Sequence, residues 1–237
     1  LTLMRVMLEQ ARREGYLGTN PAAEVQPVKT QATEKAVLTG EEVGRLFGPD
    51  ALERIWAGGR RYFVLNLIAA STGMRQGELR GLQSRHIHDE YLEVRHAWED
   101  RYGLKEPKNG AERIVPIPSR VSEEIKALLV ETPGGGPEDL LFCGRDPRYP
   151  IDKKMVQRTF SSALARIGIS EAERRLRNVS FHSWRHFFNT LCRVAKVPDS
   201  KLQKITGHRT LTMTEHYTHY RMEDFTDVRR IQERLFS

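Results

Sequence analysis

Residues 180–192, SFHSWRHFFNTLC, place two histidines and one arginine within five positions and surround them with large apolar side chains. On a helix, His182, Arg185 and His186 occupy positions i, i+3 and i+4 and therefore share one face. A second face carries large apolar side chains, namely Phe181, Trp184, Phe188 and Leu191. The stretch predicts a helix that is anchored in a core by one face and presents cationic donors on the other.

Three kinds of site fit the cationic face: a metal site, an anion site, or a polar edge of the core. Two histidines at i and i+4 can chelate zinc, but the HExxH pattern of zinc proteases needs a glutamate where this chain has Ser183. An arginine between the two ligands would also repel a dication. The pattern therefore favours an anion over a metal, and taken alone it leaves the polar edge of the core open.

Length and composition indicate a folded protein with an anionic partner. The chain has 237 residues, of which 39% are hydrophobic and 8% aromatic, and this is ordinary globular usage. It has 38 basic residues against 31 acidic ones, a formal net charge of +7 that favours nucleic acid as the partner. Cys143 and Cys192 form no disulfide framework, so a reducing interior is expected. No apolar run reaches the roughly 18 residues of a membrane span, and no membrane contact is expected.

The sequence divides near residue 30. Leu1 already lies in a helical pattern, so we expect the chain to be part of a longer protein. Its first helix ends before GYLGTNPAAEVQPVKT (15–30), whose glycines and prolines indicate a linker. Thr39 stands three residues before Glu42, which is the spacing of a capping box, and an apolar-periodic stretch follows. A second domain therefore begins after the linker.

This second domain, over residues 31–237, is predicted to be mainly α with a small antiparallel β-sheet. A long helix is expected over about 59–70. YLEVRHAW (91–98) and RIVPIP (113–118) are typical of strands, and EDRYGLKEPKNGAE (99–112) between them is interpreted as turn material. Helical patterns return further along and are interrupted at TPGGGPED and GRDPRYP. The expected fold class is α+β.

A second cationic cluster lies in STGMRQGELRGL (71–82). Its Thr-Gly pair is typical of a helix start, so Arg75 is expected in the first turn, where unpaired N–H groups and the helix dipole favour an anion. Glu78, three residues further on, can steady that arginine or the helix end. The alternative is an exposed capped helix with a surface ion pair, and Arg80 is interpreted as a surface arginine of that kind.

Three shorter motifs add candidate side chains. KEPKNGAERIVPI contains the tight-turn signal Asn-Gly, which puts Lys108 at a hairpin tip, where it can reach a neighbouring cleft or simply aid solubility. PDSKLQKITGH fits a helix that starts near its proline and is C-capped by Gly207, and His208 follows at once. TLTMTEHYTHY places Tyr217 nine residues after His208, on an expected short helix.

Together these motifs resemble the tyrosine recombinases, or phage-type integrases. The resemblance covers roughly residues 36–225 in the family's order: TGMRQGEL, the hairpin lysine before RIVPI, HSWR, TGH and HYTH. It implies the DNA breaking-rejoining catalytic fold over residues 31–237, and it makes residues 1–30 the last helix and linker of a truncated core-binding domain. The catalytic residues that it implies are Arg75, Lys108, His182, Arg185, His208 and Tyr217, with Glu78 in support.

The resemblance implies a site-specific recombinase, or integrase, in which the Tyr217 hydroxyl attacks a DNA phosphodiester to give a 3′-phosphotyrosine and a free 5′-hydroxyl. Two arginines and His208 would neutralise charge that metals neutralise in other phosphoryl transfers, so neither a metal nor a cofactor is implied. His182 would accept the tyrosine proton or orient the phosphate, and Lys108 would protonate the departing 5′-oxygen. The expected partners are double-stranded DNA and further copies of the chain, from dimer to tetramer in a synaptic complex. The expected location is the cytoplasm, at the nucleoid.

Two rival functions remain open. A type IB topoisomerase uses the same tyrosine chemistry to relax DNA, and a catalytically silent DNA-binding module would keep only the basic cleft. The residues of the TGMRQGEL and YTH motifs favour a recombinase, and the presence of all six candidate residues argues against a silent module. Tyr220 lies at i+3 from Tyr217, but the YTH match selects Tyr217 as the nucleophile. The motifs leave open the DNA target and the choice among integrase, chromosome-dimer resolvase and transposon enzyme.

Overall fold

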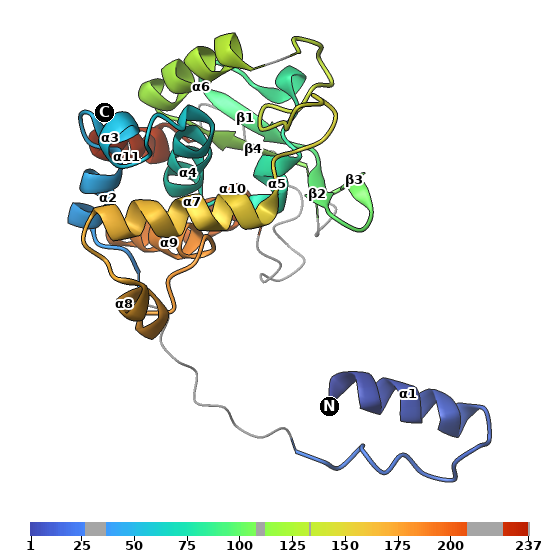
Figure 1. The fold of residues 1–237 in the computed structure, drawn as a ribbon. Helices are drawn as coiled ribbons and strands as arrows, with labels where there is room; N and C mark the ends of the chain where they lie inside the picture. The colour runs from blue at the N-terminus through green and yellow to red at the C-terminus, as the bar shows by residue number, and fades with distance from the viewer. Residues whose placement is uncertain (27–36, 108–111, 133, 208–224, 237) are drawn as a thin grey trace. The chain divides into compact units, whose positions relative to one another are not determined.

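The computed structural model describes residues 1–26, 37–107, 112–132, 134–207 and 225–236. The chain forms two compact units, Leu1–Glu34 and Lys35–Ser237 (Figure 1). No helix among these described residues is long and apolar enough to cross a membrane.

The first unit is one helix with the chain folded back along it. Helix α1 (Thr2–Arg13) has no buried residue, and several of its apolar side chains, Met4 and Met7 among them, are exposed. The returning chain is held by polar contacts. Arg5 Nε donates to the Ala22 carbonyl over 2.8 Å, and Asn20 Nδ2 donates to the Arg5 carbonyl over 3.1 Å. The helix ends before the glycine- and proline-containing stretch, as its sequence predicts.

The second unit is built around helix α4 (Arg60–Thr72), in which every residue from Phe63 to Thr72 is buried. A helix that is buried on all sides belongs in the middle of a core. Helices α6 (Ser119–Glu131), α7 (Lys153–Arg166) and α9 (Ser183–Val194) pack against it. The long helix expected over about 59–70 is therefore confirmed, with its end two residues later.

Shorter helices close the rest of this core (Figure 1). Helix α2 (Gly40–Phe47) begins with the expected capping box, in which the Thr39 side chain and the Glu42 side chain each bond the other's backbone N–H. Near the other end of the chain, Phe236 contacts the Phe47 ring with centroids 6.4 Å apart. The remaining helical elements are α3 (Ala51–Arg54), α5 (Gln76–Arg80), η1 (Ser84–His86), α8 (Glu171–Leu176), α10 (Asp199–Thr206) and α11 (Thr226–Phe236).

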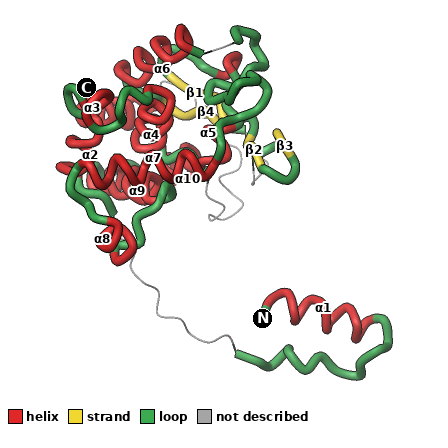
Figure 2. Tube along the Cα trace, in the orientation of Figure 1, coloured by secondary structure: helices red, strands yellow, loops and turns green. Residues whose placement is uncertain are grey.

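The strands form two small antiparallel ladders to one side of the helices (Figure 2). Strand β1 (Tyr91–Val94) pairs with β4 (Arg113–Pro116), as the sequence predicts. The described residues also include a second ladder, β2 (Ala97–Glu99) with β3 (Gly103–Lys105), so the interpretation of all of 99–112 as turn material was wrong. The chain reverses direction between β2 and β3, and Gly103, the first residue of β3, has a φ of +74°. This turn comes before the Asn-Gly pair in the sequence. The mainly α class with antiparallel strands is confirmed.

Candidate active site

The loop between α4 and α5 fixes the position of Arg75. Gly73 C-caps α4 with a φ of +67°, and a Cβ atom there would lie 2.9 Å from the Phe188 ring, so both the backbone and the space require glycine. The prediction that this Thr-Gly pair starts a helix was wrong, because the same residue types also suit a helix end. Arg75 is the N-cap residue of α5 and stands just before its first turn.

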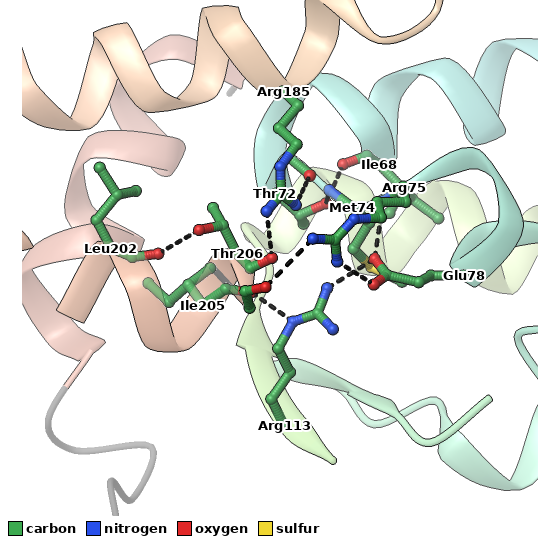
Figure 3. A network of polar contacts seen from close by, with 12 residues as sticks. Ile68, Thr72, Met74, Arg75, Glu78, Arg113, Arg185, Leu202, Ile205 and Thr206 are labelled. Carbon is green, nitrogen blue, oxygen red and sulfur yellow. Dashed lines mark hydrogen bonds and ion pairs between the residues drawn. The ribbon is translucent and has the colours of Figure 1, made fainter. Parts of the chain in front are cut away.

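Glu78 holds Arg75 from below (Figure 3). Its Oε1 accepts from Arg75 Nη1 over 2.8 Å, and its Oε2 accepts from the Arg75 backbone N–H over 2.8 Å. Glu78 is 2% exposed, so this is a buried ion pair rather than the surface pair considered above. Burial raises the pKa of Glu78, but the charges and hydrogen bonds of Arg113 and Arg75 outweigh burial and hold the pKa below its usual value. The carboxylate is therefore charged when the cluster is assembled.

Arg185 is a buried arginine on α9, with 3% of its surface exposed. Its Nη1 donates to the Gly73 carbonyl over 3.0 Å, and its Nη2 donates to the Thr206 carbonyl. Burial and the neighbouring Arg75 charge lower the pKa of Arg185 to about 9. The site thus holds a buried guanidinium close to the charge of Arg75.

The aromatic face of α9 holds this arginine in place. Trp184 is fully buried, its Nε1 donates to Asn66 Oδ1 over 2.8 Å, and its ring lies 5.2 Å from the Phe160 ring, centroid to centroid. Phe181 and Phe188 are buried as well, and Leu191 packs partly buried against the core. The anchoring face predicted from the spacing of these residues is confirmed.

The polar face of α9 lines a pocket of about 330 Å³. His182, the N-cap residue, and His186 contact each other with ring centroids 5.0 Å apart and nearly perpendicular planes. Both line the pocket together with Arg185, and Gln203 of α10 lines it from another side. No group of three or more His, Cys, Asp or Glu side chains that could hold a metal ion occurs in the described part of the chain. The three residues at i, i+3 and i+4 thus face one concave surface.

Arg113, on β4, was missed by sequence reasoning. Its Nη2 lies 2.7 Å from Glu78 Oε2, and its Nε donates to the Ile205 carbonyl over 2.6 Å. The motif RIVPI contains this arginine, but the pattern was used only to predict a strand. An arginine that interrupts the apolar alternation at the start of a strand is the one signal that was available.

The end of helix α10 gathers these arginines (Figure 3). Its last carbonyls are those of Ile205 and Thr206, and the C-cap residue Gly207 follows with a φ of +66°. Each of the three carbonyls accepts a hydrogen bond from a different arginine, since Arg75 Nη2 donates to the Gly207 carbonyl over 3.2 Å. Carbonyls at a helix C-terminus have no partner within the helix and carry partial negative charge, which cations satisfy. We call Arg75, Glu78, Arg113 and Arg185 the arginine cluster.

The interpretation of Arg80 as a surface arginine was wrong. Arg80 is 4% exposed, its Nε donates to the Ile151 carbonyl over 3.0 Å, and its Nη2 lies 2.6 Å from Asp100 Oδ1. It therefore ties α5 to the turn after β2. Three predicted site residues, Lys108, His208 and Tyr217, lie outside the described residues, as does Tyr220.

Comparison with known proteins identifies the family. The model of the phage integrase family matches residues 37–224. The chain is 26% identical over 228 residues to the tyrosine recombinase XerC of Haemophilus influenzae, with 96% of this chain and 71% of the relative covered. It is also 26% identical over 220 residues to the tyrosine recombinase XerD of Caulobacter vibrioides, with 91% and 67% covered.

Solved structures share the fold that the sequence motifs imply. The Tn1549 transposon integrase in complex with a circular intermediate DNA superposes with a TM-score of 0.68 at 21% identity, covering 98% of this chain and 76% of the integrase. A lambda integrase tetramer bound to a Holliday junction gives a TM-score of 0.61 at 20% identity, covering 92% and 59%. This chain therefore belongs to the phage integrase family and is a tyrosine site-specific recombinase.

Proposed function

We propose that this chain cleaves one DNA strand at a phosphodiester, keeps the 3′-phosphate on Tyr217, and rejoins it to a different strand. The arginine cluster is the observation that carries the proposal. Its three guanidinium groups donate to three consecutive carbonyls at the end of α10, and two of them also pair with the Glu78 carboxylate. Guanidinium groups gathered at one place bind an oxyanion through charge-assisted hydrogen bonds, and a scissile phosphate is such an anion.

The proposed roles follow from what each group can donate. The Arg75 and Arg185 guanidinium groups bind the non-bridging oxygens, where negative charge grows in the transition state, and their planar forks give bidentate contacts that lysine cannot reproduce. His208 adds a further hydrogen bond. His208 lies outside the described residues, so its role is assigned from the motif match. In the sequence it directly follows Gly207, whose carbonyl accepts a hydrogen bond from Arg75.

The proton balance needs one acceptor and one donor. A free tyrosine has a pKa of about 10, so His182 would take the proton as the Tyr217 oxygen attacks phosphorus. The bond from phosphorus to the 5′-oxygen breaks, and Lys108 would supply the proton that makes a 5′-hydroxyl. The reverse reaction with the 5′-hydroxyl of another strand completes the exchange. The phosphotyrosine diester conserves the bond, so no nucleotide is consumed.

Double-stranded DNA and further copies of this chain are the proposed partners. The formal charge of +7 supports a polyanionic ligand. Exchange between two duplexes needs a cleaving subunit for each strand, which supports assembly from dimer to tetramer in a synaptic complex. We assign residues 1–30 to the last helix and linker of a core-binding domain, and we place the site of action at the nucleoid.

A trapping experiment tests the proposal. DNA duplexes selected from a random pool by binding to the chain would carry nicks placed across the bound sequence, so that a short cleaved strand diffuses away and rejoining is blocked. Wild-type protein is expected to accumulate a covalent DNA adduct, whereas Tyr217→Phe binds DNA and forms none. Binding without any adduct would favour the silent module. Relaxation of supercoiled DNA without recombinant products would favour the topoisomerase.

A further inference from the structure

Arg113 is a buried arginine that none of the proposed chemical steps uses. It is the first residue of β4, and only 7% of its side chain is exposed. One nitrogen of its guanidinium pairs with Glu78, and another donates to the Ile205 carbonyl. The side chain therefore links three elements that are far apart in the sequence, β4, α5 and α10 (Figure 3).

These contacts form a closed ring. Glu78 uses Oε1 for Arg75 Nη1 and Oε2 for Arg113 Nη2, at 2.8 and 2.7 Å. The two arginines are then fixed at their other donors to carbonyls two residues apart, Ile205 and Gly207. Arg75 is thus held from both sides, and the carboxylate that holds it is itself held by Arg113.

Charge explains why the ring needs Arg113. Without it, the buried Glu78 carboxylate would keep Arg75 as its one cationic partner within the described residues. A buried carboxylate that loses a partner binds the remaining cation more strongly. The Arg75 guanidinium would then turn toward Glu78 and away from the Gly207 carbonyl and the open side of the cluster. The carbonyl of Ile205 would also lose its donor.

We infer that Arg113 is a positioning residue, which fixes Glu78 so that the Arg75 guanidinium faces the scissile phosphate. This inference rests on the proposed function. Arg113 needs no contact with DNA for this role, so its loss lowers the rate of cleavage rather than the affinity for DNA. Lysine at this position keeps the charge but lacks the planar fork that reaches Glu78 and Ile205 at the same time.

Single-turnover cleavage by the full chain on the nicked duplexes tests this role. At saturating DNA, Arg113→Met is expected to lower the rate of adduct formation by about 100-fold, as a misplaced reacting group does, while the Kd for DNA changes by less than about threefold. Arg113→Lys is expected to fall between wild type and Arg113→Met. Each rate is divided by the fraction of protein that is folded, which circular dichroism measures. If Arg113→Met does not fold, Arg113→Lys carries the test.

Arg177→Met is the matched control. Arg177 is a half-buried arginine that pairs with Glu42 at 2.6 Å and with Glu173 at 3.0 Å, so its removal also breaks ion pairs, one of them to a buried glutamate. It lines no part of the arginine cluster, and the variant is expected to cleave at the wild-type rate per folded molecule. A purely structural Arg113 would behave in the same way.

A double-mutant cycle identifies the route of the effect. If Arg113 acts through Glu78, adding Arg113→Met to Glu78→Gln slows cleavage by less than about threefold beyond Glu78→Gln alone, because the shared contact is already lost. The inference would be overturned if the double variant lost cleavage rate by the product of the two single-variant factors. It would also be overturned if folded Arg113→Met cleaved at the wild-type rate. If wild-type protein forms no adduct, the proposed function fails instead, and the two failures are thereby distinguished.

Discussion

Two clusters of the second unit each join arginine to a buried glutamate, and the two differ in the balance of charge. In the Arg177 cluster (Arg177, Glu42 and Glu173) one arginine meets two carboxylates. The hydrogen bond from Arg177 to Glu42 raises the pKa of the arginine. In the arginine cluster Arg75 and Arg113 share one carboxylate, Glu78, and burial lowers the pKa of Arg185 to about 9.

In the proposed function, this difference separates an ion-pair cluster that stabilises the fold from a cluster that binds the scissile phosphate. The Arg177 cluster joins α2 to α8 and is complete within the protein. The arginine cluster is held together by carbonyls at the end of α10 as well as by Glu78. The Arg177 cluster has two carboxylates for one arginine, whereas in the arginine cluster two arginines pair with the same carboxylate.

The largest effect is expected from Arg185→Lys. Charge is kept but bidentate geometry is lost, so cleavage at saturating DNA should fall by about 100- to 1000-fold while DNA affinity stays close to that of the wild type. Arg177→Lys, made as its counterpart in the other cluster, should cleave normally. Single-turnover adduct formation and filter binding measure the two quantities. An Arg185→Lys protein with full activity would remove this arginine from the site.

Glu78→Gln should unfold more easily than wild type by about 3 kcal/mol or more, because it leaves buried arginines without their carboxylate. The pH dependence has a definite sign. The pKa of Glu78 is lowered on folding from its usual 4.5, so its contribution is complete above pH 4.5 and is lost as pH falls below that value. Urea unfolding of wild type and Glu78→Gln at pH values above and below 4.5 measures this pH dependence. Parallel pH profiles for wild type and Glu78→Gln would contradict the account.

Arg177→Met should cost about 1 kcal/mol of unfolding free energy, a value typical of a partly exposed ion pair. Thermal unfolding measures the loss. Unlike Arg185→Lys, this variant is expected to lose stability with no loss of cleavage rate. A variant that lost cleavage while folded would show that a balanced cluster also serves the reaction.

A smaller effect is expected at His86 and His96, whose rings lie 5.5 Å apart between centroids. Burial is the main cause that lowers the pKa of each below 6.5, and the positive charge of Arg85 adds to it. Both are therefore neutral in the folded protein, and the unfolding free energy should decline as pH falls below 6.5. His96→Gln should weaken that decline in urea titrations between pH 7 and 5. An unchanged slope would show that this pair does not titrate on folding.

Local patterns in the sequence predicted much of what surrounds the site. The capping box at Thr39, the two faces of α9 and the C-cap at Gly207 depend on neighbours within about four residues, and the structure has all three. The pairing of β1 with β4 was also predicted, because strand patterns on either side of a turn signal limit the partners. The family resemblance supplied the fold and the candidate residues.

Contacts between distant segments could not be predicted in the same way. The side chains of Arg113 and Arg80 are buried because carbonyls and carboxylates from other elements bind them. From residue type alone, both arginines are expected to be exposed to solvent. The Thr-Gly pair before Arg75 suits a helix start as well as a helix end, so only the packing of Gly73 against Phe188 decides between them. The motifs thus contain the residues of the arginine cluster but do not predict the contacts among them.

The central claim is that arginines take the place of a metal while a tyrosine holds the DNA. Adduct formation on nicked duplexes in excess EDTA, followed by peptide mapping of the labelled residue, tests this claim most directly. We expect an undiminished adduct whose label lies on Tyr217. Loss of the adduct in EDTA with rescue by a divalent ion, or a label on Tyr220, would contradict it.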